Sequence, residues 1–236
     1  DTVPKIVSQK GNLAGVPFTA TGVAKGAGMI RPDMATLLCF IMSDVVAEPS
    51  LLKEVLAGAT HRTLNRITID GDTSTNDTAL LLANGLGGAV VKGDAAQRTF
   101  FNLIESVLMS LGKLLVKDGE GATKVVEVVV QGAESERDAR QIADTVAHSN
   151  LVKTALFGED ANWGRIIGAM GRSGVKFNPE RVDIAFNDVV IAKDGMAAGG
   201  DAEAEASKVL KEKSFSVCID LKEGTGCEEI YTSDFS

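Results

Sequence analysis

This chain is poor in the residue types from which many metal and disulfide sites are built. Its 236 residues include only three cysteines and two histidines. Cys39, Cys218 and Cys227 are too scattered for the paired spacings of a zinc site or a disulfide framework. His61 and His148 are too few for a multi-histidine metal site, and a histidine-based catalytic triad would have to use one of them. The sequence therefore predicts reduced cysteines and no bound metal.

Aromatic residues and positive charge are also scarce. Phe, Tyr and Trp make up 5% of the residues, which is too little for an aromatic platform that stacks single-stranded nucleic acid. The net charge of -8 repels phosphate backbones and anionic lipids. The apolar run Leu37–Met42 is far shorter than the ~20 residues of a membrane span, and no signal peptide opens the chain. We expect a cytoplasmic protein with no nucleic-acid partner and no membrane partner.

Glycine, by contrast, is abundant. The 25 glycines against five prolines favour many tight turns between short elements. Valine-rich runs, alternating segments and helical periodicities are mixed along the chain, so we expect an α/β (α+β) fold with helices packed on β-sheets in a layered sandwich. The glycine-rich break at residues 119–122 predicts two parts. These are a sandwich domain of residues 1–120 and a smaller C-terminal α/β lobe of residues 121–236.

The spacing of apolar residues predicts the individual elements. The longest and clearest helix is expected over residues 94–116. Ser135 is expected to cap a helix that buries Ala139, Ile142, Ala143 and Val146. Further helices are expected to begin at Pro49, to follow a cap at Asp160 as far as Met170, and to span residues 202–211. Strands are expected at residues 17–23, 35–43, 66–69, 79–83, 125–130, 151–157 and 215–221. The strand at 35–43 is nearly all apolar, which predicts that both of its faces are covered.

Several common motifs are incomplete in this chain. The segment from Asp70 to Asn76 resembles the start of a calcium loop, but Thr75 and Leu81 occupy the positions that need Gly and Glu. The glycine pairs at 26/28 and 85/87 lack the third glycine of a dinucleotide-binding turn. No P-loop and no nucleophile elbow of the Gly-x-Ser-x-Gly type occurs. The polar stretch 70–77 is therefore interpreted as a turn-rich loop.

Thr36 is the candidate nucleophile. It follows the small residue Ala35 at the head of the apolar strand, so its hydroxyl is able to attack the Ala35 carbonyl in an N-to-O acyl shift. Hydrolysis of the resulting ester frees an N-terminal threonine whose α-amine, with an ordinary pKa of ~7.7 to 8.0, replaces the missing histidine base. By residue chemistry alone, a threonine that merely begins a strand remains the alternative.

Four segments carry a resemblance to a known family. They are residues 25–38 (KGAGMIRPDMATLL), 65–77 (NRITIDGDTSTND), 117–124 (KDGEGATK) and 153–165 (KTALFGEDANWGR). In this order they resemble the ornithine acetyltransferase family, the glutamate N-acetyltransferases of arginine biosynthesis. The resemblance extends over the whole chain.

The resemblance implies self-cleavage between Ala35 and Thr36, followed by ping-pong transfer of an acetyl group from N-acetylornithine through Thr36 to glutamate. It also implies that Thr2, Lys25, Thr36 and Glu120 contact substrate. Lys25 suits a carboxylate and Glu120 suits the cationic amine of ornithine, although Glu120 alone would also fit a solvent-exposed turn. No cofactor is implied, with acetyl-CoA as a possible co-substrate. The expected assembly is an α2β2 heterotetramer of the two pieces of one precursor.

The chain departs from the family pattern at both ends. Family members carry a longer segment before the nucleophile, which holds a Thr-Gly oxyanion hole, and a short tail with further substrate-binding residues. We therefore expect a fragment that lacks both. Three alternatives remain: a self-processing aminopeptidase of related fold, an acetyltransferase of secondary metabolism, and an inactive piece that needs its missing half.

Overall fold

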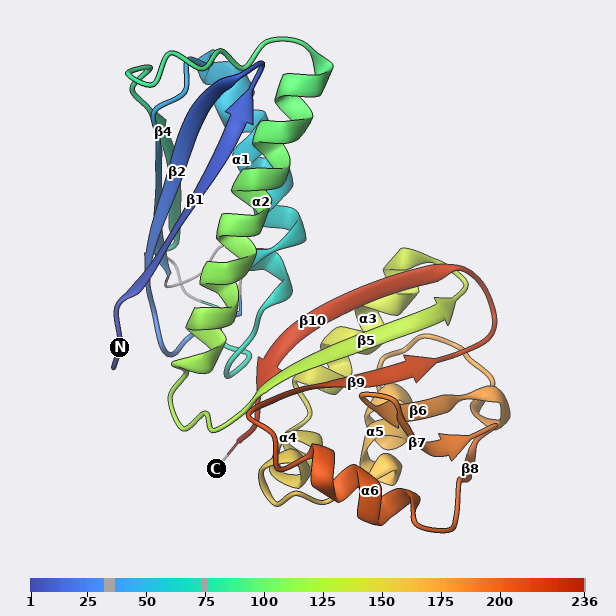
Figure 1. Ribbon diagram of the computed structural model, residues 1–236. Helices are drawn as coiled ribbons and strands as arrows, with labels where there is room; N and C mark the ends of the chain where they lie inside the picture. The colour runs from blue at the N-terminus through green and yellow to red at the C-terminus, as the bar shows by residue number, and fades with distance from the viewer. Residues whose placement is uncertain (32–36, 74–75, 236) are drawn as a thin grey trace. The chain divides into compact units, whose positions relative to one another are not determined.

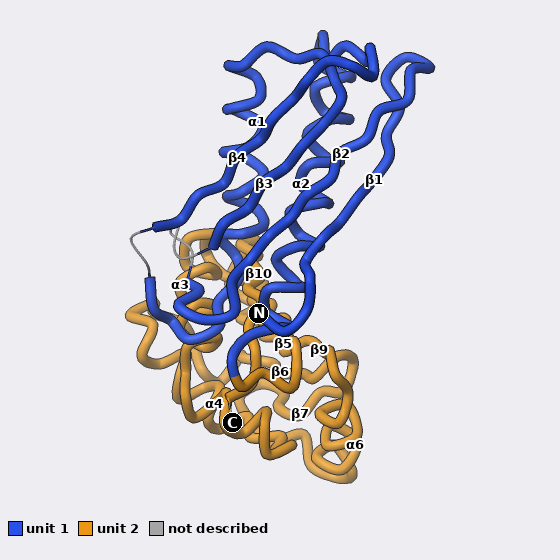
Figure 2. Tube along the Cα trace, turned by 90° about the vertical axis from the view of Figure 1, so that its left-hand side faces the viewer, with its two compact units in different colours: residues 1–120 blue, residues 121–236 orange. Residues whose placement is uncertain are grey.

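The computed structural model describes residues 1–31, 37–73 and 76–235. Within these ranges the chain forms two compact units of nearly equal length, residues 1–120 (unit 1) and residues 121–236 (unit 2), shown in Figure 2. Each unit combines one β-sheet with helices, so the expected mixed α/β fold is confirmed (Figure 1).

A four-stranded sheet forms the centre of unit 1. Its strands, in spatial order, are β1 (Lys5–Leu13), β2 (Val16–Lys25), β3 (Leu38–Ser43) and β4 (Thr78–Ala83). The first three pair antiparallel, and β4 runs parallel to β3. Ala14 and Gly15 join β1 to β2 with φ angles of 50° and 90°, the left-handed backbone of a tight hairpin. The strand expected over 17–23 lies within β2, whereas β1 has no counterpart among the expected strands.

Two helices, α1 (Pro49–Arg62) and α2 (Asp94–Lys117), cover one face of this sheet (Figure 1). The helix expected over 94–116 is thereby confirmed. Its apolar stripe is buried, and the Phe100 ring lies 5.9 Å from the Phe18 ring of β2. Among the described residues α2 is the one helix with the length and hydropathy of a membrane span. Because this stripe packs on β1 and β2, α2 serves as the core helix of unit 1.

The other face of the sheet is not covered within unit 1, which corrects the expectation for the strand at 35–43. Burial alternates along β3, where Cys39 and Ile41 are buried while Phe40 and Met42 are 37% and 43% exposed. Burial alternates in the same way along β4, where Leu80 and Leu82 are exposed. The expectation was wrong because the outward positions are apolar too, so the sequence hides the period of two.

Unit 2 contains a six-stranded sheet in the order β10-β5-β9-β6-β7-β8. The strands are β5 (Val125–Ala133), β6 (Asp183–Phe186), β7 (Val189–Lys193), β8 (Met196–Ala197), β9 (Ser214–Asp220) and β10 (Gly226–Ser233). The helices are α3 (Glu136–Ala147), α4 (Asn150–Phe157), α5 (Trp163–Met170) and α6 (Ala202–Val209). Helix α3 packs on β5 and β10. The strands expected at 125–130 and 215–221 and the four inward residues of α3 are confirmed.

Three local expectations were wrong. Residues 151–157 form helix α4 rather than a strand, because Val152, Ala155 and Leu156 recur at helical spacing and are buried together. Residues 66–69 form no strand: a 3₁₀ turn spans Leu64–Arg66, and the following apolar side chains fill the core. The cap of α5 is Asn162, whose side chain accepts a hydrogen bond from the Arg165 N–H at 3.1 Å, instead of Asp160.

Candidate functional site

The strand register of unit 1 brings three chain segments together at one end of its sheet. Lys25, the last residue of β2, pairs with Leu38, the first residue of β3. Leu38 pairs in turn with Thr78, the first residue of β4. The predicted nucleophile Thr36 and the predicted cleavage partner Ala35 lie outside the described residues. Leu37, which follows Thr36 directly, is described and is tightly held.

Asp77 and Thr78 fix both polar groups of the Leu37 backbone. The Leu37 N–H donates to Asp77 Oδ1 at 2.6 Å, and the Thr78 N–H donates to the Leu37 carbonyl at 3.0 Å. Burial raises the pKa of the Asp77 carboxyl, against the opposing effects of the Leu37 hydrogen bond and the Lys25 charge. The chain position next to Thr36 is therefore held by a carboxylate that the sequence reasoning did not single out.

Glu120 lies beside the glycine-rich segment that follows Lys25. Its N–H donates to the Ala27 carbonyl at 2.7 Å. A Cβ atom at Gly28 would stand 3.0 Å from the carboxyl carbon of Glu120, so this glycine leaves room for the carboxylate. Glu120 is exposed to solvent. Lys25 and Glu120 thus belong to two segments in direct contact.

Thr2 is bound to Asp118 at the end of α2. The Thr2 N–H donates to Asp118 Oδ2 at 2.9 Å, and the Thr2 hydroxyl donates to Oδ1 of the same carboxylate. The ammonium group of Lys5, whose side chain is fully buried, donates to Asp118 Oδ2 at 2.5 Å and also pairs with Asp1. Asp1 in turn accepts a hydrogen bond from the Gly26 N–H at 3.0 Å. This cluster ties the first residues of the chain to the segments that carry Lys25 and Glu120.

The electrostatics of this cluster are set by burial and by its hydrogen bonds. Burial pushes the pKa of Asp118 upward, but the donors on Lys5 and Thr2 outweigh it and hold the pKa well below its usual range. A carboxylate at the C-terminal end of a helix meets the unfavourable end of the helix dipole. The buried Lys5 ammonium offsets this repulsion, which explains why a lysine is tolerated in the interior.

The loop with a partial calcium pattern has a structural role in unit 1. Asp70 Oδ1 accepts hydrogen bonds from the N–H groups of Ile30 at 3.1 Å and Asp72 at 3.1 Å. The Thr73 hydroxyl donates to the Arg31 carbonyl at 3.2 Å. The loop therefore holds the segment that leads toward residue 36. Among the described residues, no group of three His, Cys, Asp or Glu side chains is placed to hold a metal ion.

The structure thus places three of the four predicted substrate-binding residues, Thr2, Lys25 and Glu120, at one end of unit 1. The fourth, Thr36, lies outside the described residues, and the structure describes only its neighbour Leu37. The sequence reasoning missed Lys5, Asp77 and Asp118. Asp77 and Asp118 lie inside the segments 65–77 and 117–124, so their place in those motifs was a usable signal. Lys5 left no signal, because its burial depends on pairing of β1 with β2.

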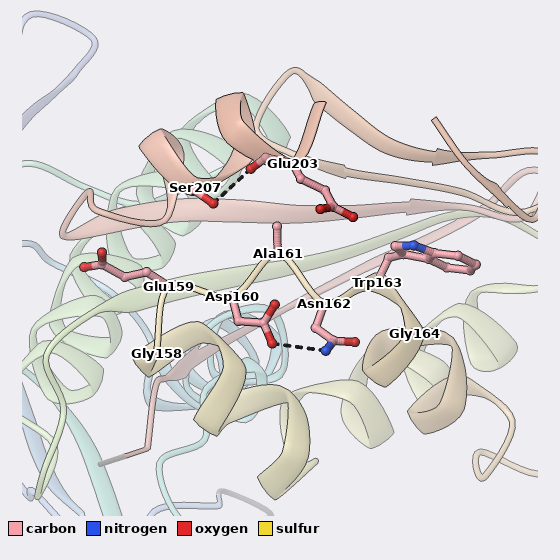
Figure 3. A pocket seen from close by; sticks show the side chains of 9 residues that line it. All are labelled: Gly158, Glu159, Asp160, Ala161, Asn162, Trp163, Gly164, Glu203 and Ser207. Atoms are coloured by element: carbon pink, nitrogen blue, oxygen red, sulfur yellow. Dashed lines mark hydrogen bonds between the residues drawn. The ribbon is translucent and has the colours of Figure 1, made fainter. Parts of the chain in front are cut away.

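The segment 153–165 lines a separate pocket within unit 2. A cavity of about 570 Å³ is bordered by residues 158–164 and by Glu203 and Ser207 of α6 (Figure 3). The Asn162 amide donates to Asp160 Oδ2 at 3.0 Å on its wall. None of the predicted site residues lines this pocket, and its polar wall carries the carboxylates of Glu159, Asp160 and Glu203.

Two buried lysines fasten the motifs of unit 2 to its sheet. The Lys124 ammonium donates to the Leu156 carbonyl at 3.0 Å, and the Lys153 ammonium donates to the Thr232 hydroxyl at 3.0 Å. The buried carboxylate of Asp234 accepts from the N–H groups of Thr123 and Lys124. Segments 117–124 and 153–165 therefore converge on the end of β10 and act here as structural anchors.

The fold and the site define a two-unit α/β protein in which Lys25 and Asp77 flank the start of the inner strand β3. The ArgJ family model matches residues 1–236. "Arginine biosynthesis bifunctional protein ArgJ" of Desulfotalea psychrophila and of Geobacter sulfurreducens are each 51% identical over 100% of this chain. The crystal structure of the protein of that name from Bacillus halodurans has a TM-score of 0.79 and 35% identity, covering 84% of this chain and 93% of that one. The chain therefore belongs to the ArgJ family.

The chain matches only part of the length of these relatives. The chain spans 61% of the length of each of the two curated relatives named above. The name of both relatives refers to arginine biosynthesis and to two functions. The resemblance stated from four sequence segments is confirmed at the level of the family.

Proposed function

We propose that the full-length protein is a cytoplasmic glutamate N-acetyltransferase of arginine biosynthesis, which transfers acetyl from N-acetylornithine to glutamate. The observation that carries the proposal is the fixed backbone of Leu37, directly after Thr36, at the sheet end where Lys25 also lies. A nucleophile needs a constant position relative to its substrate. The clamp from Asp77 and Thr78 supplies that at the adjacent residue.

The chemistry we propose for Thr36 has two stages. The hydroxyl first attacks the Ala35 carbonyl, the peptide nitrogen leaves, and water hydrolyses the ester to free an N-terminal Thr36. The new α-amine then serves as the base for the hydroxyl of the same residue. In transfer, the hydroxyl takes the acetyl group from N-acetylornithine, ornithine leaves, and the amine of glutamate accepts the acetyl group from Thr36.

The other site residues suit the charges of these substrates. We assign Lys25 to a substrate carboxylate and Glu120 to an ammonium group of ornithine, since charge-assisted hydrogen bonds are the strong ones. The contact between the Glu120 N–H and Ala27 supports this, because it holds the two residues on touching segments. Thr2 contributes a hydroxyl that Asp118 orients.

Two further parts of the proposal concern the whole protein. The word "bifunctional" in the relatives' name supports acetyl-CoA as a second acetyl donor, which would give N-acetylglutamate by a second route. Since the chain spans 61% of those relatives, we propose that the remaining length supplies the oxyanion hole and completes an α2β2 assembly of the two pieces.

Intact-mass measurement of the full-length precursor tests the first stage. We expect two pieces, the second with an N-terminal threonine, and no cutting in Thr36→Ala, whereas Thr36→Ser retains some cutting. Transfer of labelled acetyl from N-acetylornithine to glutamate tests the second stage. One uncut and fully active chain would contradict self-processing. A cut protein that releases acetate to water but never acetylates glutamate would identify a hydrolase of related fold instead.

A further inference from the structure

A network of ion pairs and hydrogen bonds connects the described residues to which we assign substrate contacts. Thr2, Lys25 and Glu120 lie on three separate segments of unit 1. We propose that Asp1 is a positioning residue for substrate binding, which holds the segment of Lys25 in a fixed relation to the other two. The inference rests on the proposed function, because it takes the substrate contacts of these three residues from there.

The chain leaves strand β2 directly after Lys25, and Asp1 holds it at that point. Gly26, the next residue, is buried and has a positive φ of 147°, a conformation that favours glycine. A buried N–H needs an acceptor, and Asp1 Oδ1 accepts from the Gly26 N–H at 3.0 Å. The exposed Lys25 is therefore attached to a backbone position that the Asp1 carboxylate fixes.

The Asp1 carboxylate is itself held by the ammonium group of Lys5. This side chain is fully buried and donates to Asp1 and, at 2.5 Å, to Asp118 Oδ2. Asp118 accepts hydrogen bonds from the N–H and the hydroxyl of Thr2 and stands two residues before Glu120. One ammonium group thus connects the segments that carry all three site residues.

The Lys25 and Glu120 segments also touch each other directly. The Glu120 N–H donates to the Ala27 carbonyl at 2.7 Å, one residue beyond the Asp1 contact at Gly26. Two neighbouring backbone positions are therefore tied to the end of α2, one directly and one through Asp1 and Lys5. A segment held at both positions keeps Lys25 at a constant distance from Glu120.

The energetics of the network favour positioning over stabilisation. The Asp1 side chain is 39% exposed, and an ion pair with an exposed partner contributes little to stability. Lys5 occupies a buried position of β1, where an apolar side chain would pack without the cost of desolvating a charge. What an ammonium group provides there, and an apolar side chain does not, is a fixed arrangement of two carboxylates.

A loosened Lys25 segment has a specific kinetic consequence. N-acetylornithine and glutamate both carry an α-carboxylate, the group that we assign to Lys25. Freeing the Gly26 backbone therefore weakens binding of both substrates. The reacting groups themselves are unchanged, so the loss is expected in KM and not in kcat.

Steady-state kinetics of the full-length protein test the inference. Asp1→Ala removes the acceptor of the Gly26 N–H and is expected to raise KM for both substrates by about 10-fold, with kcat within about two-fold of wild type. Asp1→Asn keeps an oxygen for the Gly26 and Lys5 donors and is expected to recover most of the affinity. The matched control Asp188→Ala changes an exposed carboxylate of unit 2 and is expected to keep both KM values.

Thermal melting of the same variants separates positioning from folding. Higher KM values in Asp1→Ala at an unchanged melting temperature, together with recovery in Asp1→Asn, support the inference. Unchanged KM values in Asp1→Ala overturn it. So does a rise in KM that is matched by an early melt, that Asp1→Asn shares in full, or that Asp188→Ala reproduces. A wild-type protein that transfers no acetyl from N-acetylornithine to glutamate overturns the proposed function, and with it the inference, so the two failures are distinct.

Discussion

Glu120 is the site residue whose proposed role in substrate binding is easiest to test without disturbing the fold. It is exposed, and its contact with Ala27 uses only the backbone, so exchanging the side chain leaves that contact intact. Glu120→Gln removes the charge that we assign to ornithine. A hydrogen bond to a charged group contributes about 1.5 to 3 kcal/mol, so we expect kcat/KM for N-acetylornithine to fall by roughly 10- to 100-fold.

Self-cleavage in the same variant is the internal control. The cutting step involves the Ala35 carbonyl and the Thr36 hydroxyl, so Glu120→Gln is expected to cut at nearly the wild-type rate. Unchanged kinetics with N-acetylornithine would show that Glu120 lies away from the substrate. Cutting that is impaired as strongly as transfer would show that its role is structural.

The Lys5–Asp118 pair makes a prediction about stability. Replacing Asp118 by Asn removes the buried carboxylate that pairs with the fully buried Lys5 ammonium and leaves the exposed Asp1 as its remaining ion-pair partner among the described residues. Breaking a buried pair typically costs about 3 to 5 kcal/mol, so we expect a loss of about 3 kcal/mol in the free energy of unfolding at pH 7. Urea unfolding measures this loss. Asp188→Asn, an exposed carboxylate in a turn of unit 2, is expected to change stability by less than about 0.5 kcal/mol.

The same loss depends on pH. The folded-state pKa of Asp118 is lowered, so its stabilising effect is present above the unfolded pKa of about 3.9 and disappears as the pH falls through the folded pKa. The gap between wild type and Asp118→Asn is therefore expected to narrow below about pH 4. A gap that stays constant from pH 7 to pH 3 would show that Asp118 acts through packing and not through its charge.

Among the elements, helix α3 is the one whose start the sequence predicts best. The Ser135 hydroxyl accepts a hydrogen bond from the Asp138 N–H at 3.1 Å. Ser135→Ala removes this cap and is expected to cost about 1 kcal/mol of stability, seen as a lower urea midpoint. Ser207→Ala removes the same atom from the interior of α6, where no N–H depends on it, and is expected to be neutral or slightly stabilising. Equal losses in both variants would contradict a capping role.

The sequence predicted helices correctly where the spacing of apolar residues and the capping residues indicated the same element. Helix α2 has eight apolar positions at helical spacing and was found within one residue of its expected end. The strand predicted for residues 151–157 was wrong because a short apolar run fits both a strand and a buried helix. Only the burial of Val152 together with Leu156 decides between the two. Strands β1 and β10 had no counterpart among the expected elements, since edge strands with mixed polarity acquire their structure from pairing.

For the molecule as a whole, the open face of the unit 1 sheet predicts self-association of the chain expressed by itself. Met42 and Leu82 expose apolar side chains on neighbouring strands. Exposed apolar patches of this kind drive association in water. Replacing both residues by threonine, which keeps the preference for strand structure, is expected to shift size-exclusion elution toward the monomer at high concentration.

The matched control for this prediction changes the same kinds of residue in unit 2. Val190 and Met196 are also exposed, and their replacement by threonine is expected to leave the elution of the chain unchanged. If both double variants elute like the parent chain at every concentration, the sheet face does not drive association.

The sequence by itself determined the family, the main helices and the candidate residues Thr2, Lys25, Thr36 and Glu120. It could do so because motifs and periodicities are local: each is read within a dozen neighbouring residues. The four segments kept their order along the chain, and the family match over residues 1–236 bears out the resemblance they carried.

Only the tertiary structure decided which distant residues act on one another. Asp77 reaches Leu37 because β4 runs parallel to β3 in one register, and a shift of one residue would turn it to the other face. Lys5 is buried against Asp118, which lies 113 residues away in the chain, because the β1–β2 hairpin brings the N-terminus to the end of α2. Contacts of this range leave no periodic trace in one sequence, since they depend on how separate elements pair and pack.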